Sequence, residues 1–211
     1  LPGKVLMPIL GKPMLALQIE RIQRCRLIDE IVIATSVESQ NDPIEALAVD
    51  LGVHCFRGSE RDVLSRVVGA LKAHDVDVHV EFMGDNPMPD IMLVDSIIGY
   101  YLKNTDRCDY VSNAVRTTYP PGQEVFVYRS AVLYDAESRE ADSVMREHVA
   151  VNIDQHPDRY RREAGNEVRV HRASRTAGGC HTSARTRTGR WNLGSQEDRQ
   201  YGRSALRRAG P

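Results

Sequence analysis

The stretch LPGKVLMPILGKPM occupies residues 1–14 and directs the interpretation of the rest of the chain. Gly3 and Gly11 permit a close approach of the backbone to a ligand, and Lys4 adds a compact positive charge. Apolar residues recur at helical spacing over residues 14–24, and Pro13 suits the first turn of that helix. Backbone amides at a helix start attract phosphate groups. The stretch therefore predicts the second half of a phosphate-binding loop that runs into a helix, with the first half expected before residue 1.

Short apolar runs alternate with amphipathic segments over the next hundred residues. Strands are predicted for the β-branched runs, at 31–35, 53–56, 76–83, 110–113 and 124–128. Helices are predicted at 14–24, 42–51, 59–73 and 89–102. This βαβαβ order favours a mostly parallel sheet with right-handed crossovers. We expect an α/β domain with a doubly wound, mostly parallel sheet, from which the strand at 124–128 can depart.

The charge balance changes sign late in the chain. Residues 1–168 carry 18 Lys and Arg against 27 Asp and Glu, whereas residues 169–211 carry 10 Arg against 2 acidic residues. The later segment has few large apolar residues to offset the entropy lost on ordering. Its bias towards Arg, Gly, Ala, Ser and Thr, without Lys, is also typical of a GC-rich gene read out of frame. We expect a nucleotide-binding domain at 1–168 and an Arg-rich tail at 169–211 that is either disordered or frameshifted.

The composition also argues against several classes of protein. No run is long and apolar enough to span a bilayer, and no secretory signal pattern opens the chain. Cys25, Cys55, Cys108 and Cys180 are scattered without a Cys-x-x-Cys pair, which favours free thiols in a reducing compartment over disulfides or a zinc site. We expect a cytoplasmic protein without a membrane partner, and a homodimer is compatible with this expectation.

Six short segments carry a family resemblance: LPGK (1–4), GKPM (11–14), FRGSERDVL (56–64), GDNP (84–87), YVSN (110–113) and REHV (146–149). Together they resemble the sugar-activating cytidylyltransferases, the group of the acylneuraminate and 3-deoxy-manno-octulosonate enzymes, and especially its spore-coat polysaccharide type. The likeness covers residues 1–168. Members of that family open with a buried strand and an Ala-Arg-x-Gly-Ser-x-Arg loop before Leu-Pro-Gly-Lys, so we expect the chain to be truncated at its N-terminus.

The resemblance implies a fold and a reaction. The fold is that of the nucleotide-diphospho-sugar transferases, which is glycosyltransferase-A-like. The reaction joins a sugar or sugar acid to CMP from CTP with Mg²⁺ and releases pyrophosphate, in surface polysaccharide biosynthesis. Positioning and electrostatics dominate such transfers to phosphorus. The expected partners are therefore CTP and a sugar or sugar acid.

Two residues are the catalytic candidates. Lys4 matches the family lysine that contacts the triphosphate; alternatively, it is a solvated loop residue. Asp85 follows a predicted strand, at the sheet edge where open α/β folds place ligands. The resemblance makes Asp85 the Mg²⁺ ligand, and a carboxylate oxygen suits that ion. Alternatively, Asp85 only forms a turn or caps a helix.

Five further residues are site candidates through the resemblance. Arg57, Ser59 and Asp62 match the stretch that lines the nucleotide pocket, although Ser59 and Asp62 are also spaced as a capping box. Glu124, where the family has Asp, and His148 match the sugar side of the site. A histidine in a helix is more often structural than catalytic, so a structural role for His148 stays open.

Three alternatives to an active cytidylyltransferase remain at this point. The chain could be an inactive, truncated remnant of the family. It could be a glycosyltransferase or nucleotidyltransferase that uses another nucleotide, because the fold does not decide between them. A nucleic-acid-binding protein that works through the Arg-rich tail is the least favoured, because few aromatic residues are interleaved with the arginines and no recognised motif accompanies them.

Overall fold

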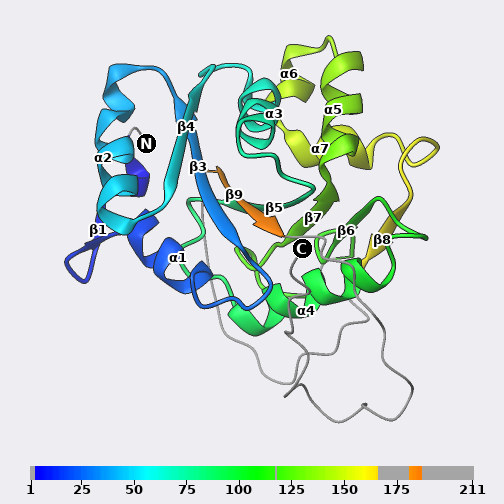
Figure 1. Cartoon of the computed structure of the whole chain (residues 1–211), viewed down its shortest axis with the longest axis horizontal. Helices are drawn as coiled ribbons and strands as arrows, with labels where there is room; N and C mark the ends of the chain where they lie inside the picture. Colours follow the sequence, from blue (N-terminus) through cyan, green and yellow to red (C-terminus); the bar gives the residue numbers. More distant parts are fainter. Residues whose placement is uncertain (1–2, 117, 166–180, 187–211) are drawn as a thin grey trace, which may run out of the picture.

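The computed structural model describes residues 3–116, 118–165 and 181–186. A twisted sheet forms the middle layer, with helices on both of its faces (Figure 1). The strands of this sheet, in spatial order, are β4 (His54–Gly58), β3 (Glu30–Ser36), β9 (His181–Thr186), β5 (Val78–Met83), β7 (Phe126–Arg129), β6 (Tyr110–Ser112) and β8 (Arg162–Ala164). A short hairpin of β1 (Pro8–Ile9) and β2 (Lys12–Pro13) stands apart from it.

The helices belong to two groups. One face of the sheet is covered by α1 (Met14–Ile22), α2 (Asp42–Leu51) and α4 (Ile91–Lys103). The other face is covered by α3 (Val63–Ala73), α5 (Ser130–Arg139) and α7 (Val149–Asp154), with the short α6 (Ser143–Glu147) beside them. Single 3₁₀ turns, η1 (Lys4–Leu6) and η2 (Ser39–Asn41), precede β1 and α2.

Strand direction sets where the ends of the strands meet. The pairs β3–β4 and β6–β8 are parallel, whereas every pairing made by β7 or β9 is antiparallel. Within the described part of the chain, β3, β4, β5, β6 and β8 therefore run in one direction and only β7 and β9 oppose them. This confirms the expected α/β class. It also brings the carboxyl ends of β3, β4 and β5 to one edge of the sheet.

The side chains of β3 alternate between the two faces of the sheet, and each face packs against its own group of helices. Ile31 and Ile33 pack with the helices of the first group, and Val32 and Ala34 pack against α3 on the opposite face. All four side chains are buried. A strand that is apolar on both faces belongs inside a sheet with helices on either side, as the sequence predicted for this run.

Most predicted elements agree with the structure to within two residues at each end, and two predictions need correction. The helix expected from residue 59 begins at Val63, because Asp62 is its N-cap and accepts the Ser65 N–H at 2.9 Å. The strand predicted at 124–128, for which a departure from the sheet was left open, stays in the sheet as β7, between β5 and β6. The helix at 42–51 ends as predicted at Gly52, which has the left-handed φ of 67° that favours glycine.

The strand β9 lies within the stretch expected to be a tail. It pairs with β3 on one side and β5 on the other, so these six residues are an interior strand of the sheet. The remaining residues of 169–211 lie outside the described residues, and so do the expectations of disorder or a shifted reading frame there. The boundary at 168 stays a prediction.

The cysteines in the described part of the chain are free thiols, as expected. Burial raises the pKa of Cys25 to about 12, and it raises the pKa values of Cys55 and Cys108 to about 11. These thiols therefore stay protonated at neutral pH and are poor nucleophiles. None of the helices described is long and apolar enough to cross a membrane.

The position of β9 yields a prediction about stability. We expect a variant that ends at residue 180 to melt more than about 5 °C below a variant that ends at residue 186, equivalent to roughly 1–2 kcal/mol. Without β9, the backbone groups of β3 and β5 lose their partners in the middle of the sheet. Circular dichroism melting of the two variants measures the difference. Equal midpoints would show that β9 contributes nothing to the sheet.

Candidate functional site

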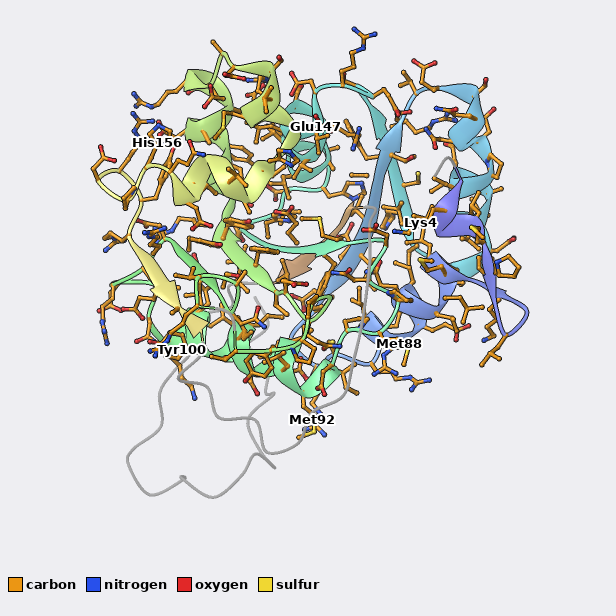
Figure 2. The ribbon with its side chains drawn as sticks, turned by 180° about the vertical axis from the view of Figure 1, so that it is seen from behind. Lys4, Met88, Met92, Tyr100, Glu147 and His156 are labelled. Atoms are coloured by element: carbon orange, nitrogen blue, oxygen red, sulfur yellow. The ribbon has the colours of Figure 1, made fainter. Side chains whose placement is uncertain are left out.

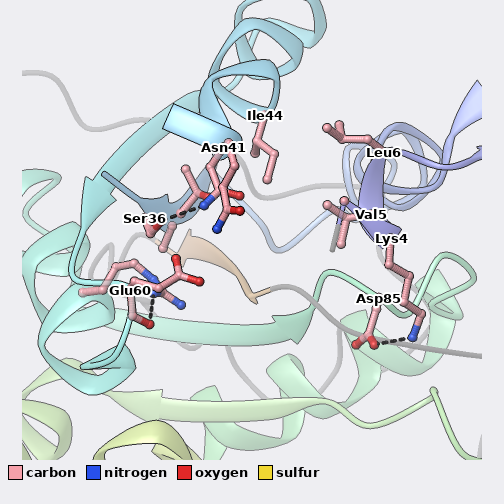
Figure 3. A pocket seen from close by; sticks show the side chains of 13 residues that line it. Lys4, Val5, Leu6, Ser36, Asn41, Ile44, Glu60 and Asp85 are labelled. Carbon is pink, nitrogen blue, oxygen red and sulfur yellow. Dashed lines mark hydrogen bonds and ion pairs between the residues drawn. The ribbon is translucent and has the colours of Figure 1, made fainter. Parts of the chain in front are cut away.

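A pocket of about 420 Å³ opens beside the carboxyl ends of β3 and β5. Open α/β sheets bind ligands in the crevice outside these strand ends. Figure 3 shows two walls: Lys4 and Asp85 lie on one, and Ser36, Asn41 and Glu60 lie on the other. The strand β9 lies between β3 and β5, the two strands from which the walls extend.

The first wall holds the two catalytic candidates together. The Lys4 Nζ atom donates to Asp85 Oδ2 at 2.7 Å, although the two residues are 81 positions apart. Gly3, with a φ of 68°, turns the chain into η1 and so places Lys4, while Asp85 lies two residues after the end of β5. The side chains are 42% and 25% exposed. A pair this exposed contributes at most about 1 kcal/mol, so a ligand can replace either partner at little cost.

The second wall is built from the end of β3 and the segment before α3. The Ser36 hydroxyl accepts from Asn41 Nδ2 at 2.6 Å and from the Glu38 N–H at 3.2 Å. Arg66 lines the pocket, and its Nη1 atom donates to the carbonyl of Ser59 at 2.5 Å. The ionised residues lining the pocket are Lys4, Arg66, Glu60 and Asp85, so their formal charges cancel.

Arg57 lies behind the pocket and holds the second wall in place. Its guanidinium forms ion pairs with Asp42 at 2.6 Å and Glu45 at 2.8 Å, both in α2. It also donates to the Ser36 carbonyl at 3.0 Å. The hydrogen bonds to Glu45 and Asp42 raise the pKa of the Arg57 guanidinium above its usual value. Arg57 is not among the residues that line the pocket.

Ser59 and Asp62 organise the start of α3. The Ser59 hydroxyl accepts the Asp62 N–H at 3.0 Å, but the N-cap of α3 is Asp62, so the alternative with Ser59 as the cap is wrong. The second carboxylate oxygen of Asp62 binds Arg146 at 2.9 Å through Nε and at 2.8 Å through Nη2. The FRGSERDVL and REHV segments are therefore in contact.

The two sugar-side candidates, Glu124 and His148, lie in different parts of the structure. Glu124 accepts the Gly122 N–H at 2.7 Å, and Asn86 Nδ2 lies 3.5 Å from it, which puts Glu124 beside the GDNP loop. His148 is an exposed residue between α6 and α7, and it does not line the pocket. Figure 2 shows its neighbour Glu147 among the helices of the second group and Lys4 beside α2.

Gly11 has a different role from the one expected. Leu10 and Gly11, with φ values of 52° and 82°, form the turn of the β1–β2 hairpin, in which Ile9 pairs with Lys12. A two-residue turn of this kind needs a positive φ at both central positions, which glycine supplies. Gly3 lines the pocket, whereas Gly11 does not.

Sequence reasoning missed Ser36, Asn41, Glu60 and Arg66. One signal was available for Ser36, because it directly follows the buried run 31–35 and so stands at the carboxyl end of a predicted strand. The other three depend on how loops return to that strand. Helical spacing places Arg66 on α3. It does not predict that the Arg66 guanidinium donates hydrogen bonds to the carbonyls of residues 59 and 60.

Comparison with known proteins identifies the family. The sequence model of the cytidylyltransferases matches residues 1–179. An uncharacterised protein of Methanocaldococcus jannaschii is 35% identical over 161 residues, which are 76% of this chain and 64% of that protein. The spore coat polysaccharide biosynthesis protein SpsF of Bacillus subtilis is 33% identical over 166 residues, 76% of this chain and 67% of SpsF. The match thus spans about two thirds of these relatives.

Solved structures agree with this assignment. A cytidylyltransferase from Leptospira borgpetersenii serovar Hardjo-bovis superposes with a TM-score of 0.75 at 26% identity, over 78% of this chain and 69% of that one. A synthetase of CMP and 2-keto-3-deoxy-manno-octonic acid, solved with CTP, shares the fold with a TM-score of 0.58 at 16% identity, over 78% and 83%. On the strength of the family match and of the fold, this chain belongs to the cytidylyltransferase family.

Proposed function

We propose that the chain transfers a cytidylyl group from CTP to a sugar or sugar acid and releases pyrophosphate. The observation that carries this proposal is the Lys4–Asp85 pair, which faces a pocket at the carboxyl edge of a cytidylyltransferase fold. In the reaction, a sugar hydroxyl oxygen forms a bond to the α-phosphorus of CTP. The bond from that phosphorus to the pyrophosphate oxygen breaks, and the hydroxyl proton is lost.

The charges of the pocket support a role for a divalent cation. Two cationic and two anionic side chains line it, so a nucleotide triphosphate brings several uncompensated negative charges. Mg²⁺ is commonly held by one or two carboxylates together with the phosphates of a substrate. Asp85, a partly exposed carboxylate on the pocket wall, fits that pattern, and Glu60 lines the same pocket. When bound, the ion would neutralise charge that develops on the phosphate oxygens.

Lys4 and Asp85 would exchange partners when the nucleotide enters. The Lys4 ammonium would leave the carboxylate for a phosphate oxygen, and Asp85 would then be free to hold the cation. Each charge keeps a partner of opposite sign before and after the exchange. The pair is partly exposed and therefore weak, which supports an exchange at low energetic cost.

The remaining candidates take supporting roles in this proposal. Arg57 and Asp62 would act as positioning residues, because they fix β3 against α2 and α3 against α6. Backbone groups near Ser59 would face the nucleotide. Glu124, beside Asn86, would lie on the sugar side, and His148 would reach a sugar only if α6 and α7 move.

The biological setting follows from the relatives and the thiols. SpsF is named for spore coat polysaccharide biosynthesis, and a relative from Zea mays that is 33% identical over 101 residues is named a 3-deoxy-manno-octulosonate cytidylyltransferase. These names support an activated sugar acid as the product. The free thiols in the described residues support a reducing, cytoplasmic location.

Nucleotide choice is testable by thermal shift. With Mg²⁺ present, we expect CTP to raise the melting midpoint more than UTP, GTP or ATP, because at equal concentration the ligand that binds more tightly stabilises the folded state more. Omitting Mg²⁺ should reduce the CTP shift, since the pocket has no net positive charge of its own. A larger shift with another nucleotide would reassign the substrate. The lack of a shift with all four would leave the inactive remnant as the better description.

Replacing Asp85 tests the cation site. We expect Asp85→Asn to keep the melting midpoint within a few degrees, because the side chain is nearly isosteric, but to reduce the gain in CTP affinity that Mg²⁺ provides. Isothermal titration with and without Mg²⁺ measures that gain. Asp50→Asn, at an exposed position in α2, is the matched control. If Asp85→Asn retains the full Mg²⁺ effect, Asp85 is only a turn residue.

Replacing Lys4 tests the triphosphate contact. We expect Lys4→Ala to weaken CTP binding by roughly 1.5–3 kcal/mol, about ten- to a hundredfold, through loss of a charge-assisted contact. Lys12→Ala is the control, since Lys12 is an exposed lysine of the same segment that pairs with Glu20. Equal losses in the two variants would indicate a general charge effect, and equal affinity of Lys4→Ala and the parent would remove Lys4 from the site.

A further inference from the structure

A second group of potential ligands lies at the opposite edge of the sheet. Glu30 is the first residue of β3, His54 is the first residue of β4, and His74 directly follows α3. The chain passes from α3 into β5 within four residues, so the last turn of α3 lies over the strand starts. The pocket of the proposed nucleotide site is at the strand ends.

The register of the sheet directs the three side chains to one face. Val32 of β3 pairs with His54 of β4 in parallel, and Glu30 precedes Val32 by two positions. Because alternate residues of a strand share a face, Glu30 and His54 lie on the same side of the sheet as Val32. Val32 packs against Ala70 of α3, so this is the face that α3 covers and on which His74 arrives.

The donor atoms are close enough to share one ion. His74 Nδ1 lies 2.7 Å from Glu30 Oε1, and His54 Nε2 lies 3.6 Å from the same oxygen. One ligand atom from each residue falls within 4.8 Å of the other two. Ligands of a tetrahedral zinc ion, with bonds of about 2.0–2.2 Å, are about 3.3 Å apart. Small side-chain rotations would therefore complete the geometry, and His54, 62% exposed, is free to turn.

The group contains more than a single ion pair, because both histidine rings lie beside the same Glu30 oxygen. The bond between Glu30 and His74 needs no third residue, yet the His54 ring stands 4.8 Å from the His74 ring, tilted by 56°. Two protonated imidazoles at this distance would repel each other. Two neutral imidazoles and a carboxylate instead offer the nitrogen and oxygen donors that suit Zn²⁺, Co²⁺ or Ni²⁺ better than Mg²⁺.

The group is also open to solvent on one side. A pocket of about 280 Å³ is lined by Glu30 and His54, but not by His74. Because the His54 side chain is 62% exposed, solvent reaches the group, and water can occupy a fourth ligand position.

We propose that Glu30, His54 and His74 form a binding site for a transition-metal ion such as Zn²⁺, separate from the proposed nucleotide site. The ion would link β3, β4 and the end of α3. Because the three residues would be fixed together only in the folded chain, binding would stabilise the fold.

Cobalt provides a direct spectroscopic test on the full chain. We expect Co²⁺ to bind with a stoichiometry of about one per chain and to give the intense visible absorption of a tetrahedral site with nitrogen and oxygen ligands. Zn²⁺ should displace it and raise the melting midpoint. The lack of saturable Co²⁺ binding would overturn the proposal.

Substitutions assign the site to these residues. We expect His54→Ala, at an exposed position, to keep the metal-free melting midpoint and to weaken Co²⁺ binding at least about tenfold. His74→Gln should weaken binding to a similar extent. His156→Ala, which removes a histidine after α7, and Asp85→Asn, in the nucleotide pocket, should leave Co²⁺ binding unchanged. If His54→Ala binds Co²⁺ as the parent does, the three residues form only a hydrogen-bonded pair with a neighbouring ring.

Discussion

The pairing of β3 and β5 with the same interior strand sets the width of the pocket. Residue Thr182 of β9 is opposite Ile33 of β3 and opposite Phe82 of β5. The strands β3 and β5, which flank β9, therefore lie two strand spacings apart, about 9.5 Å. Ser36 ends β3 and Asp85 follows β5, and the two walls of the pocket extend from these points. If β9 were removed and its neighbours closed together, the walls would approach each other by about one spacing. The backbone ladder of β9 is therefore the constraint on which the site depends.

The site combines a rigid framework with weak polar contacts. Buried residues on both faces of β3 fix the sheet between its helices, and Arg57 and Asp62 tie the loops of the second wall to neighbouring helices. The Lys4–Asp85 pair, in contrast, is partly exposed and costs little to open. This division would suit the proposed nucleotide binding, because the walls would keep their spacing while the charged groups exchange partners. The histidine group at the opposite edge would reinforce the same framework at the starts of β3 and β4.

Sequence patterns predicted the parts of the fold that depend on local periodicity. The two-sided apolar run at 31–35 and the Asp-Pro start and Gly52 end of α2 gave correct elements, and the strand before Asp85 placed that residue at the carboxyl edge of the sheet. Lys4 became a candidate through the loop pattern and the family resemblance, and its pairing with Asp85 was not predicted. The patterns failed where a distant partner decides the structure. β9 has little apolar character, yet two neighbouring strands supply its hydrogen bonds, and Arg57 has its role because α2 presents two carboxylates to it. Gly11 was assigned to a phosphate loop, although the hairpin turn explains it.

The central claim is that the pocket between β3 and β5 holds a nucleotide with a divalent cation. A crystal structure with CTP and Mn²⁺ tests it directly, because the anomalous scattering of manganese locates the ion independently of the nucleotide. The account predicts an anomalous peak beside the Asp85 carboxylate, the triphosphate between the two walls, and the Lys4 ammonium on a phosphate oxygen. Nucleotide bound elsewhere, or a Lys4–Asp85 pair unchanged at 2.7 Å in a crystal saturated with CTP and Mn²⁺, would contradict it.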